Sequence, residues 1–532
     1  MRSGAWIHRP AVLGTRQTLK RWRQWRSGAG VGLALVLLGA GLAAASRLVA
    51  SEPAAEVRGL DAPVNQGARD AGDISANNSP TLARDPRKRQ NLAVVDRIDT
   101  PRFSCALHVS SDGGSRWSRV PIEIPKGQGG KCYAPDVTFT SDGRLHMSYV
   151  TLKGPGNVPS AAWLVTSRDG GRTLSKPRKV IGPRAFQVRL AADPNDPRLL
   201  YLSWVQARDV GLYKFAQAGN PILIARSADG GSTWGRPVQV NDASRVRALA
   251  PSVTVGPKGE VYLLYLDLGG DRLDYEGAHQ GLGGPPYAGR FKLVLGRSLD
   301  HGATWAESVV DDRVVPIERF IAFLPSFPSV AVDPKDGRVY ASFHDRRFGT
   351  PDVLVWSRAA DGTAWEGPTR VNDTPKRDGS SQYLPKIAVA PGGRVDVVYY
   401  DRRSDPKDVM NEVALQSSFD HGKTFSSRTT LSSRPFDSRI GYGSERGLPD
   451  LGSRLGLVTD DSSAYAVWTD TRAGSVDSNK QDLGLAKVAI PEHSGLRKTA
   501  GYALGFGGGA LALVGLLMLV SARRRGRASM AH

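Results

Sequence analysis

Cysteine is scarce in this chain of 532 residues, which contains only Cys105 and Cys132. So few cysteines exclude a small fold held together by several disulfides. Acidic residues are missing from both ends: residues 1–51 hold eight basic residues and 496–532 hold six, with no aspartate or glutamate in either segment. Of the net charge of +20, only +6 remains for the residues between. The basic charge therefore lies at the ends, and we expect no nucleic-acid partner.

Motifs for common cofactors are missing as well. No spacing of cysteine and histidine fits a structural zinc site, no Gly-x-Gly-x-x-Gly opens a helix, and no Gly-x-Ser-x-Gly occurs. We expect no cofactor and no metal site. Calcium bound by Asp267, Asp271 and Asp274 is the alternative that the sequence leaves open.

Two apolar runs border the basic ends. Within the N-terminal segment of residues 1–50, the apolar run at 28–45 follows basic residues and ends in small residues, which is typical of a signal peptide or an uncleaved signal anchor. Residues 499–521 carry no charge and precede a basic tail at 522–532, which predicts a transmembrane helix with a cytoplasmic tail. We therefore expect a cell-membrane protein, with one or two membrane passes, whose middle region lies outside the cytoplasm. In that oxidising compartment Cys105 and Cys132 are expected to form a disulfide, the alternative being two buried thiols.

One short phrase recurs through the middle of the chain. It reads Ser-x-Asp-x-Gly-x-x followed by an aromatic or leucine, and a degenerate copy carries one inserted residue. Copies start 57, 60, 71, 59 and 61 residues apart. The six turn aspartates are Asp112, Asp169, Asp229, Asp300, Asp361 and Asp420. Repetition at this period predicts a propeller or a solenoid, with the aspartates accepting hydrogen bonds from turn amides.

Alternating apolar residues around each phrase predict four short strands per repeat. First strands are expected near residues 80, 135, 190, 251, 328, 385 and 455. We predict an all-β propeller of four-stranded antiparallel blades over residues 78–490, with seven blades favoured and six as the alternative. The seventh unit lacks a fourth strand, so residues 53–75, within a linker at 51–77, are the candidate closing strand.

The phrase resembles the Asp box, or BNR repeat, of sialidase-like β-propellers, and the resemblance covers about residues 78–490. The resemblance implies a propeller fold and a glycoside hydrolase of exo-α-sialidase type, whose site would combine an arginine triad, a tyrosine nucleophile activated by glutamate, and an aspartate acid/base. The chain has no Arg-Ile-Pro segment in its first unit. Candidates are therefore assigned by position on the rim of the propeller: Tyr442, Glu445 and Asp401 for catalysis.

A second phrase, Asp-Arg or Asp-x-Arg, follows the second strand of several units. One interpretation is an arginine cluster that binds an anionic sugar, because guanidinium groups bind carboxylates in pairs of hydrogen bonds. The other is a structural lock, in which each arginine pairs with an aspartate of its own or the adjacent blade. The candidate ligand-binding residues are Arg97, Arg189, Arg346, Arg402 and Arg472.

The sequence thus predicts a membrane-anchored, extracytoplasmic propeller that acts on anionic glycans. A propeller that binds a protein or an envelope polysaccharide without catalysis, and a structural assembly factor, are the alternatives.

Overall fold

The computed structural model describes residues 29–43, 55–65, 75–210, 217–271, 287–317, 326–441, 451–491, 507, 509–521 and 523–524. The chain forms two compact units. One comprises Met1–Ala54 with Pro491–His532, and the other comprises Ala55–Ile490.

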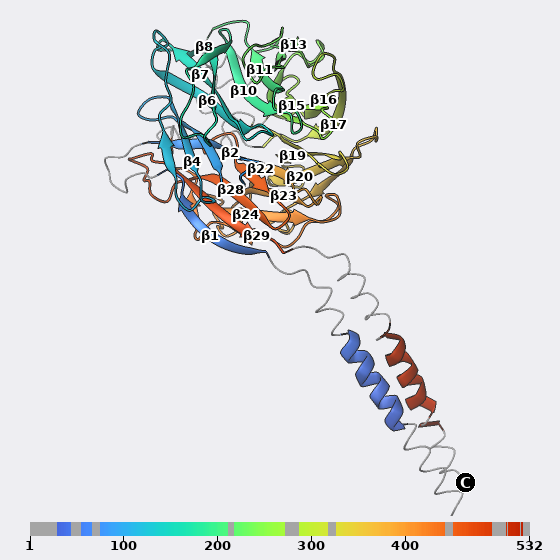
Figure 1. Cartoon of the computed structure of the whole chain (residues 1–532). Helices are drawn as coiled ribbons and strands as arrows, with labels where there is room; N and C mark the ends of the chain where they lie inside the picture. Colours follow the sequence, from blue (N-terminus) through green and yellow to red (C-terminus); the bar gives the residue numbers. More distant parts are fainter. Residues whose placement is uncertain are drawn as a thin grey trace, which may run out of the picture. The chain divides into compact units, whose positions relative to one another are not determined.

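The second unit is a β-propeller of seven antiparallel sheets (Figure 1). Strands A to D of a blade run outward from the axis, and the innermost strands of neighbouring blades contact one another in a closed ring. Blades one to three are β2 (Asn77–Arg84), β3 (Leu92–Ile98), β4 (Ser104–Ser110), β5 (Ser118–Val120); β6 (Lys131–Phe139), β7 (Leu145–Lys153), β8 (Val158–Ser167), β9 (Arg178–Ile181); and β10 (Ala185–Ala192), β11 (Leu200–Gln206), β12 (Ile222–Ser227), β13 (Val238–Gln239). Blades four and five are β14 (Ala248–Val255), β15 (Val261–Asp267), β16 (Phe291–Ser298), β17 (Ala306–Val314); and β18 (Ser329–Val332), β19 (Val339–Asp345), β20 (Asp352–Arg358), β21 (Glu366–Arg370). Blade six is β22 (Gln382–Val389), β23 (Val395–Asp401), β24 (Met410–Ser418), β25 (Thr429–Thr430), with β26 (Phe436–Asp437) also paired to β24. The prediction of seven four-stranded blades is confirmed.

The seventh blade is built from both ends of the propeller. Its strands are β27 (Gly456–Thr459), β28 (Ser463–Asp470) and β29 (Asp482–Ala489), and its outermost strand is β1 (Glu56–Pro63), which pairs antiparallel with β29. Val64 follows β1, is fully buried, and donates its backbone N–H to Leu483 O at 3.0 Å. The strand missing from the seventh repeat thus comes from residues that precede the first blade.

The core lies between the blades. Second strands such as β15 and β23 are buried along their whole length, because each sheet packs against a neighbour on both faces. Their sequences, VYLLYLD and VDVVYYD, supply the aromatic and branched side chains that fill these spaces. The disulfide Cys105–Cys132 joins β4 of blade one to β6 of blade two.

Five of the repeated turns share one hydrogen-bond network. In the turn of blade three, Ser227 Oγ donates to Asp229 Oδ1 at 2.9 Å and accepts from Gly231 N at 2.9 Å. Asp229 also accepts from Thr233 N and Thr233 Oγ1, at 2.8 and 2.6 Å. These bonds, with the Thr233 hydroxyl first, lower the pKa of Asp229 to about 2. The degenerate turn differs, because Asp361 lies four positions after Ser357 and not two, and no hydrogen bond to Asp361 is found in the described part of the chain.

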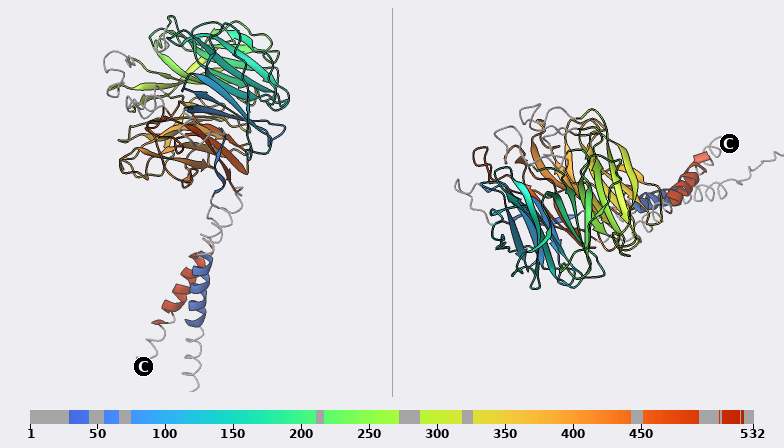
Figure 2. Two further views of the ribbon diagram at one scale, coloured as in Figure 1. Left: turned by 90° about the vertical axis from the view of Figure 1, so that its left-hand side faces the viewer. Right: turned by 90° about the horizontal axis from the view of Figure 1, so that it is seen from above.

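The first unit contains helical residues at 29–43 and 509–521, which lie side by side (Figure 2). They approach closely at two glycines: a Cβ added to Gly515 would lie 2.6 Å from Gly32 O. Within the described residues, no helix combines the length and the hydropathy that a membrane span requires. Of the predicted span at 499–521, the structure describes residue 507 and residues 509–521.

Candidate functional site in the axial channel

A β-bulge interrupts the inner strand of five blades near its start. In each bulge a residue other than glycine has a positive φ: Ser79, Ala134, Gln187, Ala250 and Leu384, at 47–58°. Such a bulge turns the side chain that follows it, because the strand register shifts by one residue. The residues two positions later, with their counterparts in blades five and seven, form what we call the axial ring: Thr81, Asp136, Arg189, Ser252, Ser329, Lys386 and Arg454.

Contacts between blades that are not neighbours place this ring at the axis. Arg454 of blade seven donates from Nη2 to Pro135 O of blade two at 2.6 Å, and from Nε to Thr81 Oγ1 at 2.9 Å. The guanidinium carbon of Arg189, in blade three, lies 5.3 Å from the centre of the Phe327 ring, which precedes blade five. Side chains from across the propeller therefore converge in its channel.

The ring also joins adjacent blades. Asp136 accepts a hydrogen bond from Leu190 N at 2.8 Å and pairs with Arg189 at 3.4 Å. Ser252 Oγ donates to Pro328 O at 2.6 Å, and Ser329 Oγ accepts from Ile387 N at 3.1 Å. These bonds connect blade two to three, blade four to five and blade five to six, and they fix the positions of Asp136 and Arg189.

Three cations of the ring face one carboxylate. Arg454 is 8% exposed, Lys386 is partly exposed, and Asp136 is the acidic member. Burial lowers the pKa of Arg454 to about 9, and repulsion from Arg189 contributes to that shift. Burial likewise lowers the pKa of Lys386 to about 8, with Arg189 adding to the effect and Asp136 opposing it. An anion bound here would relieve this repulsion.

A second, neutral cluster lies beside the ring. Arg97, at the end of β3, pairs with Asp99 at 2.7 Å and donates to Tyr133 OH at 3.2 Å, with its guanidinium 5.2 Å from the Tyr133 ring centre. Arg97 is among the charged groups that lower the pKa of Arg454. Two predicted ligand-binding residues, Arg97 and Arg189, thus lie close to the axis. Arg189 lies within β10, after its bulge, and not before the first strand as the sequence suggested.

The Asp-Arg phrases of the rim form locks between blades. In the phrase that follows β23, Asp401 pairs with Arg403, the second arginine, at 2.6 Å, and Arg403 also reaches Asp373 of the preceding blade at 2.5 Å. In blade seven Arg472 contacts Asp470 and donates to Ser433 at 2.9 Å. Arg347 makes the same kind of bridge, from Asp345 to Asp311 of blade four.

Arg346 and Arg402 occupy the middle position of this phrase, so they are not equivalent to Arg472. Arg402 is buried and donates to Asn411, Ser438 and Tyr383 at 2.9–3.2 Å and to Asp408 O at 2.8 Å. Arg346 has no ion pair within the described ranges, and its Nε is buried without a hydrogen-bond partner. Three of the predicted ligand-binding residues, Arg346, Arg402 and Arg472, therefore have different surroundings.

Of the three predicted catalytic residues, the structure describes Asp401. Asp401 is fully buried and accepts from Gln382 Nε2 at 3.1 Å in addition to pairing with Arg403 and Arg428. Tyr442 and Glu445 lie outside the described residues.

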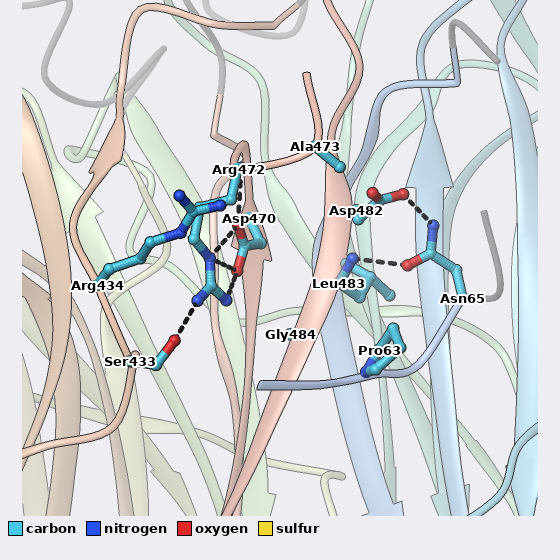
Figure 3. Close-up of a pocket in the computed structure, with 10 residues that line it drawn as sticks. All are labelled: Pro63, Asn65, Ser433, Arg434, Asp470, Arg472, Ala473, Asp482, Leu483 and Gly484. Carbon is cyan, nitrogen blue, oxygen red and sulfur yellow. Dashed lines mark hydrogen bonds and ion pairs between the residues drawn. The ribbon is translucent and has the colours of Figure 1, made fainter. Parts of the chain in front are cut away.

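A cavity of about 610 Å³ lies at the seam that β1 closes (Figure 3). Arg434 and Arg472 line it together with Asp470 and Asp482, and Asn65 donates to Asp482 at 2.7 Å. The two cations are balanced by two carboxylates, so the cavity offers an anion no net attraction. The axial ring, with its excess of positive charge, is the stronger candidate.

The sequence reasoning missed Asp136, Lys386 and Arg454. A signal was present, because a proline precedes the ring residue in five units: Pro80, Pro135, Pro251, Pro328 and Pro385. These prolines were interpreted as strand starts, whereas each inner strand except that of blade five begins before its proline. A polar residue after each of these prolines was the pattern that could have identified the ring.

No family model matches the chain, and no curated protein is similar to it in sequence. Among solved structures, a protein of unknown function from Dyadobacter fermentans is 14% identical, with a TM-score of 0.45, over 82% of this chain and 100% of that one. The Hadza microbial sialidase Hz136 is 15% identical, with a TM-score of 0.41, over 75% and 73%. An ulvan lyase bound to a GlcA-Rha3S unit is 13% identical, with a TM-score of 0.43, over 84% and 99%. Likenesses at this level indicate no function, which depends on the side chains of the site.

Proposed function

We propose that this chain is a sialidase-like propeller that binds an anionic glycan at the mouth of its axial channel. The observation that supports the proposal is the convergence of Arg189, Lys386 and Arg454 on the axis against Asp136 alone. Guanidinium and ammonium groups held in a partly buried site bind carboxylate or sulfate groups by charge-assisted hydrogen bonds. Lys386 Nζ is the group best placed to do so, because it is partly exposed and no hydrogen bond involves it in the described ranges.

The surroundings of Asp401, the catalytic candidate that the structure describes, favour binding over hydrolysis. Asp401 would have to exchange protons with a substrate, yet it is fully buried and engaged by two arginines. The exo-α-sialidase activity implied by the resemblance of the repeat would therefore depend on Tyr442 and Glu445, which lie outside the described residues. We retain hydrolysis as an outcome of the test.

We further propose that the propeller lies outside the cytoplasm and is anchored by residues 28–45 and 499–521. Support comes from the basic segments beside both runs and from the leucine and valine side chains that the helical residues expose: Val31, Leu33, Leu37, Leu38, Leu513, Val514, Leu516, Leu517 and Val520. Such clustered apolar exposure is stable in lipid and not in water. Protease added to intact cells should remove the propeller and spare a tag placed after His532. Loss of that tag would contradict this topology.

The binding proposal is tested by isothermal titration of the full-length protein with three anionic ligands, sialyllactose, oligogalacturonate and a heparin oligosaccharide, and with neutral arabinan. At least one anionic ligand should bind, and Lys386→Gln should weaken that binding about tenfold or more, which corresponds to one charge-assisted hydrogen bond. Lys423→Gln removes an exposed lysine from a turn of the same blade and should have no effect. Equal binding by wild type and Lys386→Gln would exclude the ring as the site. Release of sugar in the same samples would establish hydrolysis.

A further inference from the structure

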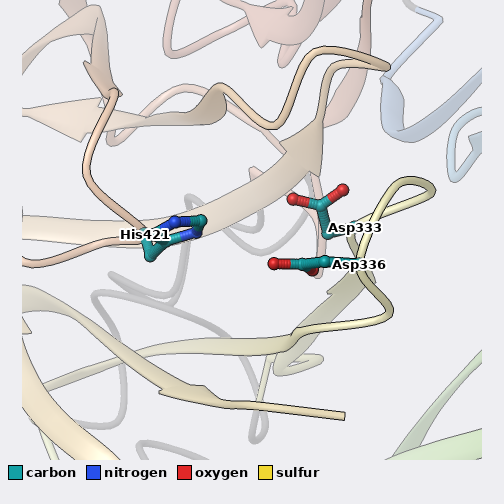
Figure 4. A group of neighbouring side chains, drawn as sticks. All are labelled: Asp333, Asp336 and His421. Carbon is teal, nitrogen blue, oxygen red and sulfur yellow. The ribbon is translucent and has the colours of Figure 1, made fainter.

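Three potential metal ligands meet on the face of the propeller opposite the B-to-C loops. Asp333 and Asp336 lie in the turn between β18 and β19 of blade five, and His421 lies in the repeated turn after β24 of blade six. One ligand atom from each residue lies within 4.8 Å of the other two, and Figure 4 shows the two carboxylates and the imidazole grouped together. The group joins two blades and is independent of the axial ring.

The three side chains face each other without bonding to each other. In the described part of the chain no hydrogen bond or ion pair joins His421 to Asp333 or Asp336. Asp333 is 1% exposed. Within the described ranges its carboxylate accepts hydrogen bonds only from backbone N–H groups, such as Lys335 N at 2.8 Å, and no lysine or arginine pairs with it. A buried carboxylate without a cation is costly unless a cation binds there.

The surrounding residues leave the cluster open to a cation. Arg338, which donates its backbone N–H to Asp336 at 2.8 Å, directs its side chain to Ser357 and Glu366 at 3.3 and 3.5 Å and so does not neutralise Asp336. Tyr340 OH lies 3.5 Å from His421 Nδ1. When Nδ1–H donates to that hydroxyl, the lone pair of Nε2 is available to a metal, as in many histidine ligands whose other nitrogen is hydrogen-bonded.

Blades three and four contain a matched arrangement that differs in one respect. Asp193 and Asp196 occupy the same positions in an Asp-Pro-x-Asp turn, and His301 lies near them in the repeated turn of the next blade. There, however, Arg198 pairs with Asp196 at 2.8 Å and supplies the positive charge internally. Blade one has Asp85-Pro86 followed by Lys88 in place of the second aspartate, and the next blade has Gly170 in place of histidine. The histidine and the second aspartate thus occur together.

We propose that Asp333, Asp336 and His421 bind one divalent transition-metal ion that connects blades five and six. Two carboxylate oxygens and one imidazole nitrogen suit Zn²⁺, Mn²⁺, Co²⁺ or Ni²⁺, whereas Ca²⁺ prefers oxygen ligands alone. Water would complete the coordination, since Asp336 and His421 are exposed. The ion would supply the positive charge that Arg198 supplies in the equivalent turn.

The test uses Zn²⁺ and Co²⁺ on the full-length protein after treatment with a chelator. Wild type should bind one equivalent of Zn²⁺ by titration calorimetry, gain thermal stability with it, and show a Co²⁺ absorption spectrum. His421→Gly should lower the affinity at least about tenfold and abolish the thermal shift. Glycine is a mild replacement because His421 has a φ of +63°, and Gly113, Gly170 and Gly230 occupy the same position in other turns.

His301→Gly is the matched control, and it should bind Zn²⁺ like wild type. Asp336→Asn, which keeps the size of the side chain, should behave like His421→Gly. The proposal is overturned if wild type binds neither of the two metals, or if His421→Gly and Asp336→Asn bind them with unchanged affinity. It is also overturned if His301→Gly loses as much metal affinity as His421→Gly does. Normal melting of the chelated variants shows that any loss comes from the ligands and not from unfolding.

Discussion

Arg189 and Asp136 form an ion pair of 3.4 Å between blades three and two, and within the described residues this pair leaves Lys386 and Arg454 of the axial ring without an acidic partner. Burial and, after it, repulsion from Arg189 lower the pKa of Lys386 and of Arg454. The charge of the channel therefore depends on pH on the alkaline side of neutrality, and this dependence affects glycan affinity and stability in opposite directions.

Binding of an anionic glycan should weaken as the pH rises. The pKa of Lys386 is lowered from 10.5 to about 8, first by burial and then by Arg189, so its ammonium is charged at pH 6.5 and largely neutral at pH 9.5. We expect affinity to fall about tenfold over this interval, as one charge-assisted hydrogen bond is lost. Titration calorimetry at several pH values measures the effect. Lys386→Arg should lose less affinity than wild type over this interval, and a wild-type profile that is flat over it would contradict the assignment.

Stability without ligand should change in the opposite direction. Between pH 8 and 10.5 the unfolded chain binds a proton at Lys386 that the folded chain has released. The contribution of Lys386 to the free energy of unfolding therefore rises with pH through this window. The measurement is urea unfolding of wild type and Lys386→Gln at pH 7.5 and 10. The difference between the two proteins should shift in favour of wild type at the higher pH, and a shift toward the variant would refute the lowered pKa.

The turn aspartates should divide into two classes. Asp229→Ala removes the acceptor of three hydrogen bonds and should lower the free energy of unfolding by about 1 kcal/mol, a typical net value for such bonds. Asp361→Ala should have almost no effect, because no hydrogen bond holds Asp361 in the described part of its turn. Chemical denaturation of both variants tests this contrast, and equal destabilisation would show that the degenerate copy has the same role as the others.

Substitutions of the rim arginines should likewise differ in their effect on stability. Arg472→Ala leaves the buried Asp470 without its partner and should lower the free energy of unfolding by about 1–3 kcal/mol while glycan affinity stays unchanged. Arg346→Ala removes no ion pair of the described ranges and should leave the melting temperature nearly unaltered. Melting curves and glycan titrations of both variants distinguish a lock from a binding site. Loss of glycan affinity at normal stability in Arg472→Ala would restore the arginine-cluster interpretation of the rim.

The fold could be predicted from the sequence because the repeated turn and its spacing are local signals. The sequence does not decide between an anion-binding cluster and Asp-Arg locks along the rim, because the order of residues does not determine whether Arg402 or Arg403 faces Asp401. The axial ring could not be predicted, because its members reach the channel through bulges at residues such as Ala134 and Leu384 that carry no glycine. Lys386 and Arg454 are far apart in the sequence and meet only when the propeller closes. Tyr442 and Glu445 stay predictions.

Closure itself should depend on the residues that complete the seventh blade. Val64 is fully buried among Leu82, Leu483 and their neighbours at the junction of blades seven and one, and its N–H bonds to Leu483 O. Val64→Asp would place a charge in this apolar cluster and should lower the free energy of unfolding by at least about 2 kcal/mol, the burial energy of valine alone.

Arg58→Gln in the preceding strand β1 is the control, because that side chain is exposed and its pairing with Glu56 at 3.4 Å is a surface contact. We expect Arg58→Gln to melt like wild type. Since Val64 joins the two ends of the ring, Val64→Asp should also weaken glycan binding, by separating Arg454 of blade seven from Thr81 of blade one and Pro135 of blade two. Urea unfolding combined with titration of the bound glycan measures both effects. A Val64→Asp protein that unfolds and binds like wild type would show that the buried side chain of Val64 is not needed to close the propeller.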